Sequence, residues 1–171
     1  QKLFGKAFQK IKNQMIVEFL NHPVTLELKG GLNASNISGT LGGRSGNLFS
    51  FIGFNSGDDP TKAIEEVLQS TEFRFLRLTT KSIEFSVSVP DPKEVFAVTP
   101  MPWAPGRSWA KGIESGISGL GYYINKVSSG SRSGRGVQTS KQISRGSRFK
   151  NTQYISAILK KYKKQFENIQ L

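Results

Sequence analysis

The side chains best suited to chemistry in this sequence are cations, and they are concentrated in its last third. Residues 126–171 contain eleven Lys or Arg and one acid, Glu167, whereas residues 1–125 contain thirteen basic and eleven acidic side chains. Six of the cations stand at short intervals in a Gly/Ser-rich stretch, residues 128–150. They are Arg132, Arg135, Lys141, Arg145, Arg148 and Lys150. An extended chain with this spacing is suited to following a phosphate backbone without reading bases.

We predict that residues 128–150 form a flexible basic arm, because Gly and Ser leave a backbone too entropic and too well solvated to build a core. Three roles are open for this arm. It contacts double-stranded DNA, or it docks on an acidic neighbour and becomes ordered only in an assembly, or it is a solvated loop that keeps the protein soluble. Its single aromatic residue, Phe149, gives little support for stacking on single-stranded bases.

A second candidate site is the proline-rich segment 99–109, for which we expect a rigid turn. It contains Trp103, Arg107 and Trp109. Trp and Arg dominate interface hot spots, so these three residues are a candidate subunit-interface anchor. The alternative, which the sequence slightly favours, is that the two Trp side chains are buried anchors of the domain itself.

No catalytic centre is expected from the remaining residues. His22 is the only histidine, and because Pro23 follows it, we interpret it as a helix-terminating residue rather than a catalytic base. The acidic pairs at 58–59 and 65–66 fit a helix start and a solvated helix face better than a metal site. The absence of cysteine from the sequence excludes disulfides, thiolate metal ligands and a Cys nucleophile. We therefore predict a protein that is not an enzyme, with no catalytic or metal-binding residues and no cofactor.

The elements that position these residues are indicated by hydrophobic spacing. Apolar residues every three or four positions predict helices over about residues 2–20 and over 151–171, the second with a cap at Asn151 or Thr152. Two shorter helices are predicted, one starting at the Asp-Asp-Pro sequence of 58–60 and one following Trp109. Period-two alternation and short apolar runs predict strands at 24–28, 48–54, 73–75 and 83–89. On the C-terminal helix the side opposite the apolar residues carries lysines 160, 161, 163 and 164.

This order of elements predicts an α+β fold, in which one antiparallel or mixed sheet packs with an N-terminal helix, short internal helices and a C-terminal helix. A chain of 171 residues is suited to a single domain. We expect a compact core over residues 1–127, the basic arm over 128–150, and a C-terminal amphipathic helix over 151–171 that packs on the core. No apolar run is long enough to cross a bilayer and no signal peptide precedes Gln1, so no membrane partner is expected.

Three stretches together resemble the small neck proteins of tailed bacteriophages, which act in head–tail joining or tail completion. The first is ISGTLGGRSGNLFSFIGF at 37–54, leading into Asp59-Pro60 and a short helix. The second is the turn at 100–109 followed by GIESGI at 112–117. The third is the Gly/Arg arm, which ends in RFKNT at 148–152 and an amphipathic helix. The resemblance spans roughly residues 20–168 and rests on the order and character of these stretches.

The resemblance implies a virion structural protein that forms a homo-oligomeric ring around a channel for double-stranded DNA. Its implied partners are further copies of itself, the neighbouring connector or adaptor protein, the tail-tube or terminator protein, and the DNA in the channel. Its implied location is the neck or tail of the virion, after assembly in the host cytoplasm. The typical joining protein has a shorter and less basic segment before its last helix, so the resemblance implies no role for residues 126–150.

The alternative function is sequence-independent nucleic-acid binding through the basic arm. A calculated pI of about 10.1 and the clustered arginines favour it. The nearly neutral first 125 residues, which contain no recognisable nucleic-acid-binding module, favour the joining role instead.

Overall fold

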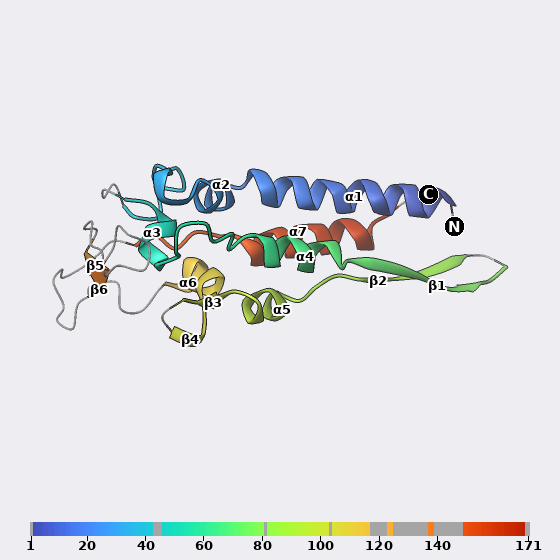
Figure 1. The fold of residues 1–171 in the computed structure, drawn as a ribbon. Coiled ribbons are helices and arrows are strands. Elements are labelled where there is room, and N and C mark those ends of the chain that lie inside the picture. Colours follow the sequence, from blue (N-terminus) through green and yellow to red (C-terminus); the bar gives the residue numbers. More distant parts are fainter. Residues whose placement is uncertain are drawn as a thin grey trace.

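The computed structural model describes residues 2–42, 46–80, 82–102, 104–116, 123–124, 137–138 and 149–169. Two long helices lie side by side along it, namely α1 (Lys2–Asn21) and α7 (Ile155–Glu167). A two-stranded ribbon extends from one end of this pair, and most of the shorter elements lie towards the other end (Figure 1). Helices and antiparallel strands are therefore both present, as expected for the predicted α+β class.

The two long helices confirm their predictions, and both are amphipathic. The buried side chains of α1 are those of Phe4, Phe8, Met15 and Phe19. The buried side of α7 consists of Ile155, Ile158, Leu159, Tyr162 and Phe166, while lysines 160, 161, 163 and 164 are exposed. The apolar sides of the two helices face each other and the rest of the core, so α7 is packed on the body of the protein.

Two predicted strands are helices. Residues 24–28 belong to α2 (Pro23–Lys29), and residues 48–52 form α3 (Leu48–Ile52). In α2 the apparent alternation hides a helical spacing, because Val24 and Leu28 lie one turn apart and are both buried. A short apolar run such as that of α3 fits a buried strand or a buried helix equally well.

The ends of α3 explain why a helix forms there. The Asn47 side chain caps the start by accepting a 2.9 Å hydrogen bond from the Ser50 backbone N–H. Gly53 ends the helix with φ of 91°, a left-handed conformation that favours glycine.

The strands form separate antiparallel pairs instead of the single sheet that the sequence predicts. β1 (Glu72–Leu78) pairs with β2 (Ile83–Ser88), which confirms the strands predicted at 73–75 and 83–89. The turn predicted at 99–109 contains the pair β3 (Pro100–Met101) and β4 (Ala104–Ser108). The third pair is β5 (Tyr123–Ile124) with β6 (Val137–Gln138). Of the predicted arm, only residues 137–138 and 149–150 lie among the described residues.

Four short helical elements connect these parts: η1 (Gly31–Asn33), α4 (Lys62–Gln69), α5 (Pro92–Ala97) and α6 (Trp109–Ser115). α4 begins later than predicted, because Asp59 accepts hydrogen bonds from the backbone and hydroxyl of Thr61 ahead of the first turn. α5 was not predicted, although Asp91 and Glu94 form a capping box at its start.

Helices α1, α2, α3, α4, α6 and α7 supply most of the core, and Val95 of α5 is also buried in it. Trp109 is buried within this core, with its ring edge-on to Phe54 at a centroid distance of 5.9 Å. Among the helices of the described residues, none has the length and apolar character to cross a bilayer.

Candidate assembly surface

The β1–β2 hairpin has one apolar and one polar face. Its strands pair Phe73 with Val87, Phe75 with Phe85 and Leu78 with Ile83, and side chains on opposite positions share a face. We call the face formed by these six residues the inner face. A register shift between Phe75 and Arg77 leaves Leu76 as an extra residue, as in a β-bulge. The outer face consists of Glu72, Arg74, Arg77, Glu84, Ser86 and Ser88.

The half of the inner face that contains Phe73 and Phe85 packs on α1. The Phe4 ring stacks on Phe85, with centroids 3.9 Å apart and planes 8° apart. Phe73 lies against Phe4 and Phe8 at centroid distances of 5.2 and 4.9 Å. Phe8 also contacts Phe166 of α7 at 5.2 Å. This aromatic cluster therefore joins the hairpin to both long helices.

The other half of the inner face is uncovered. Figure 1 shows the hairpin extending past the end of the chain where α1 begins. Leu78 is 70% exposed and Ile83 45%, and the bulge residue Leu76 next to them is 58% exposed. With Phe75 and Leu3, they make up five of the nine exposed large hydrophobic side chains of the described residues. A concentration of apolar surface of this kind is typical of a protein–protein contact.

Both outer edges of the hairpin are open in the described part of the chain, because β1 and β2 pair only with each other. Such an edge has unpaired backbone N–H and C=O groups, to which another strand can be added. A two-stranded hairpin needs a further strand or packing against a helix to be stable in water, and α1 supplies such packing only to the half of the hairpin that it covers.

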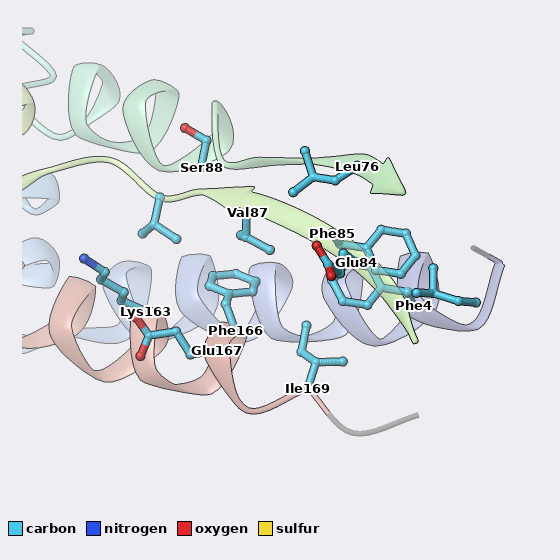
Figure 2. Close-up of a pocket in the computed structure, with 12 residues that line it drawn as sticks. Phe4, Leu76, Glu84, Phe85, Val87, Ser88, Lys163, Phe166, Glu167 and Ile169 are labelled. Atoms are coloured by element: carbon cyan, nitrogen blue, oxygen red, sulfur yellow. The ribbon is translucent and has the colours of Figure 1, made fainter. Parts of the chain in front are cut away.

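A groove of about 720 Å³ runs between β2 and α7. In Figure 2, Val87 points from β2 towards α7, and Phe166 points from α7 towards β2. Its apolar lining consists of Phe4, Leu76, Ile83, Phe85, Val87, Val89, Phe166 and Ile169. The polar lining residues are Glu84, Ser88, Lys163 and Glu167. The open edge of β2 therefore lies next to a groove that is lined by both apolar and polar groups.

The outer face carries two ion pairs. Arg74 contacts Glu72 at 2.7 Å within β1, and Arg77 contacts Glu84 of β2 at 2.8 Å. Both pairs are exposed, so they contribute little to stability. The charged residues of the hairpin are distributed unequally between its strands. β1 has two arginines and one acid, whereas β2 has one acid and no cation.

The positions of the two helices that flank the groove are held by Glu18 of α1. Its carboxylate accepts hydrogen bonds from Lys161 and, at 2.7 Å, from the Tyr162 hydroxyl of α7. Burial acts to raise the pKa of Glu18, but these hydrogen bonds and the Lys161 charge outweigh it and hold the pKa below its ordinary value. Burial, together with the hydrogen bond to Glu18, raises the pKa of Tyr162. Glu18 therefore acts as a charged link between α1 and α7.

The described members of the predicted sites do not come together. Lys150 is exposed, and its backbone N–H donates a 2.8 Å hydrogen bond to the Thr40 carbonyl. Arg107 is exposed on β4. Trp109 is 1% exposed, which corrects its assignment as a subunit-interface anchor, because a side chain buried in its own core has no surface for a neighbour. Outside the described residues lie Trp103, Arg132, Arg135, Lys141, Arg145 and Arg148.

His22 begins a helix as well as following one. Its Nδ1 accepts a hydrogen bond from the Val24 backbone N–H at the start of α2. Its ring lies 4.8 Å from that of Tyr154. Within the described ranges, no group of three or more His, Cys, Asp or Glu side chains is arranged to hold a metal ion.

Sequence reasoning found the strands of the hairpin but missed the surface that they create. The available signal was the strand FRFLRL, in which three consecutive residues from Phe75 to Arg77 break the alternation and add an apolar residue. The sequence pattern does not predict where the hairpin lies relative to α1, and this position determines which apolar residues of the hairpin are covered.

No family model, no characterised protein and no solved structure matches this chain.

Proposed function

We propose that this protein is a structural protein of the tailed-bacteriophage virion, which joins the portal or connector to the tail as a homo-oligomeric ring around the DNA channel. The proposal includes no catalytic role. Its partners are further copies of the chain, the adjoining connector and tail proteins, and the double-stranded DNA that passes through the ring.

The observation that carries this proposal is the uncovered half of the β1–β2 hairpin. Leu78 and Ile83 of the inner face and the bulge residue Leu76 are exposed, between two open strand edges. In a protein that acts alone, these features promote aggregation, whereas in an assembly they become buried contacts. The proposed location of this assembly, the neck of the virion, comes from the resemblance to neck proteins.

Immunogold electron microscopy of phage particles from the source culture tests this proposal. An antibody to the protein is expected to label the junction between head and tail. Labelling along the tail or capsid would retain a structural role and discard the neck position. If the antigen is present in cells and virions carry no label, the proposal is wrong.

Sequence-independent nucleic-acid binding is a second candidate, favoured by the exposed lysines of α7 together with a net charge of +12. Binding to duplex DNA at several salt concentrations separates the two functions. If all six arm cations contact phosphates, the log–log salt slope is about −5, at roughly −0.9 for each contact. A variant in which these six residues are replaced by Ser preserves the length of the arm. Loss of DNA binding with assembly retained would favour nucleic-acid binding, and loss of assembly would favour the joining role.

A further inference from the structure

We propose that the open edge of β2, with its adjoining groove, binds the β1 edge of a second copy of this chain. The hairpins would then form one continuous antiparallel sheet across subunits. This inference rests on the proposed self-assembly and specifies the surface that makes it.

The shape and chemistry of the groove fit an added strand. The side chains of Ile83, Phe85 and Val87 lie along the β2 side of the groove, and Phe166 and Ile169 line the α7 side. A strand placed there gains backbone hydrogen bonds from β2. Its apolar side chains enter the groove at every second residue. It also covers Leu76 and Ile83, which the rest of the described chain leaves exposed.

The β1 strand of another copy has the matching pattern. Because β1 and β2 run antiparallel, a neighbour in the same orientation presents β1 antiparallel to β2, so the sheet continues without a change of direction. Phe73 and Phe75 of the neighbour then share a face with Phe85 and Val87. The polar residues of the incoming strand share the outer face with Glu84 and Ser86.

Charge favours β2 with β1 over either strand with itself. β1 contributes Arg74, Arg77 and Glu72 to the outer face, a net charge of +1, whereas β2 contributes Glu84 and no cation, a net charge of −1. Pairing β2 with β1 brings strands of opposite net charge together. Pairing β2 with β2, or β1 with β1, brings strands of like net charge together. Like charges opposite each other destabilise strand pairing.

The contact is heterologous, because each copy uses its β2 edge on one side and its β1 edge on the other. Repetition of such a contact gives a closed ring when the rotation between copies closes, and an open filament when it does not. A symmetric dimer would require the same edge from both copies. The strand edges that meet at the contact therefore distinguish this arrangement from a two-fold symmetric dimer, and they can be identified by experiment.

Cysteine cross-linking tests the choice of edge, and the natural sequence contains no cysteine to interfere. Ser86→Cys marks β2 and Arg74→Cys marks β1, both on the outer face. Each single variant is treated with a short flexible bis-maleimide alone, and also after the two have been unfolded in urea and refolded together. We expect the cross-linked dimer to form several-fold faster in the mixture than with either variant alone, because equivalent residues of neighbouring copies lie two strand spacings, about 9.6 Å, apart in the continuous sheet. The double variant is avoided, because residues 74 and 86 are paired within one hairpin.

Faster cross-linking of Ser86→Cys with itself than with Arg74→Cys would show that two β2 edges meet and would overturn the inference. If electron microscopy shows rings and the mixture gives no cross-link, the inference is wrong while the proposed ring stands. If the unmodified protein remains monomeric at all concentrations in sedimentation equilibrium, both the inference and the proposed ring are contradicted.

A matched pair of isoleucine variants tests the apolar part of the contact. Ile83 on the hairpin is 45% exposed and Ile37 in the loop after η1 is 52% exposed, so Ile→Ser removes a similar surface at each. We expect Ile83→Ser to weaken self-association about tenfold or more, as for a residue central to an interface. Ile37→Ser is expected to leave self-association unchanged. Circular dichroism confirms that both variants fold, and equal self-association of the two would contradict the proposed surface.

Discussion

The carboxylate of Glu27 accepts a 2.7 Å hydrogen bond from the backbone N–H of Leu48, the first residue of α3. Its second oxygen accepts a 2.9 Å hydrogen bond from the backbone N–H of Ser38. Glu27 is fully buried on α2, so it holds the intervening loop and the start of α3 against that helix. A buried carboxylate is costly unless its oxygens are hydrogen-bonded, and these two backbone donors meet that requirement.

Glu27→Gln is expected to destabilise the protein by about 1.5–3 kcal/mol, because the amide has one acceptor oxygen where the site has two backbone donors. The free energy of unfolding from urea titration measures the change. Glu66→Gln, at an exposed position on α4, is the matched control and should change stability by less than about 0.5 kcal/mol. Equal effects of the two variants would show that Glu27 does not hold the loop.

Phe4→Ala is expected to release the hairpin from the body, because it removes the ring that stacks on Phe85 and contacts Phe73. Loss of a packed Phe side chain costs about 3 kcal/mol. We expect most of this loss as faster hydrogen exchange of the β1 and β2 amides, with little change in α7. Leu3→Ala, at the neighbouring exposed position, is the control for the isolated subunit. Uniform loss of protection in α7 and the hairpin would mean that the hairpin and body unfold as one unit.

The elements that could be predicted from the sequence are those whose periodicity is long or regular. α1 and α7 each repeat apolar residues over several turns, and polar and apolar residues alternate throughout β2 and in the first half of β1. α2 and α3 could not be distinguished from strands. They have seven and five residues, too few for the period of the apolar residues to identify a helix or a strand. The capping residues Asn47 and Gly53 were the available signal for α3.

The contacts that organise the candidate surface join residues far apart in the sequence, and the local spacing of apolar residues does not predict such contacts. The Phe4–Phe85 stack joins residues that are far apart in sequence, and the exposure of Leu78 depends on where α1 begins beside the hairpin. The position of Trp109 shows the same limit. Its residue type fits an interface or a core, and only its packing against Phe54 places it in the core.

His22 is expected to make stability depend on pH. Burial lowers the pKa of His22 from its ordinary value of 6.5, against the opposing effects of the Gln153 backbone and the Glu18 charge. The unfolded chain therefore binds a proton more readily than the folded one. The stability contribution is complete above about pH 6.5 and is lost as the pH falls from there through the lowered pKa of the folded state. Protonation of Nδ1 also removes the acceptor for the Val24 N–H.

Urea titrations between about pH 5 and 8 test this dependence on the single histidine, whose ordinary pKa lies in that window. His22→Asn supplies a side-chain cap that does not titrate, so the fall in stability below pH 6.5 should be shallower than in the native protein. Loss of the contact with Tyr154 would lower the stability of the variant equally at every pH. Parallel curves for the two proteins would exclude His22 as the titrating group.

Glu114→Ala is expected to fray the first turn of α7 and lower stability by about 0.5–2 kcal/mol, the usual cost of losing a helix cap. The predicted caps Asn151 and Thr152 do not serve this helix, since the N-cap position is Tyr154 and has no side-chain capping bond. The Glu114 carboxylate of α6 caps the helix instead. It accepts hydrogen bonds from the Ser156 backbone N–H at 2.8 Å and from the Ser156 hydroxyl at 2.6 Å.

Ser156→Ala is the control for this cap, because it keeps the backbone hydrogen bond to Glu114 and removes only the hydroxyl. Its loss of stability should be smaller than that of Glu114→Ala. Since both variants remove the hydroxyl contact, their effects should be less than additive in the double variant. Additive effects would mean that Glu114 stabilises the protein by some route other than the start of α7.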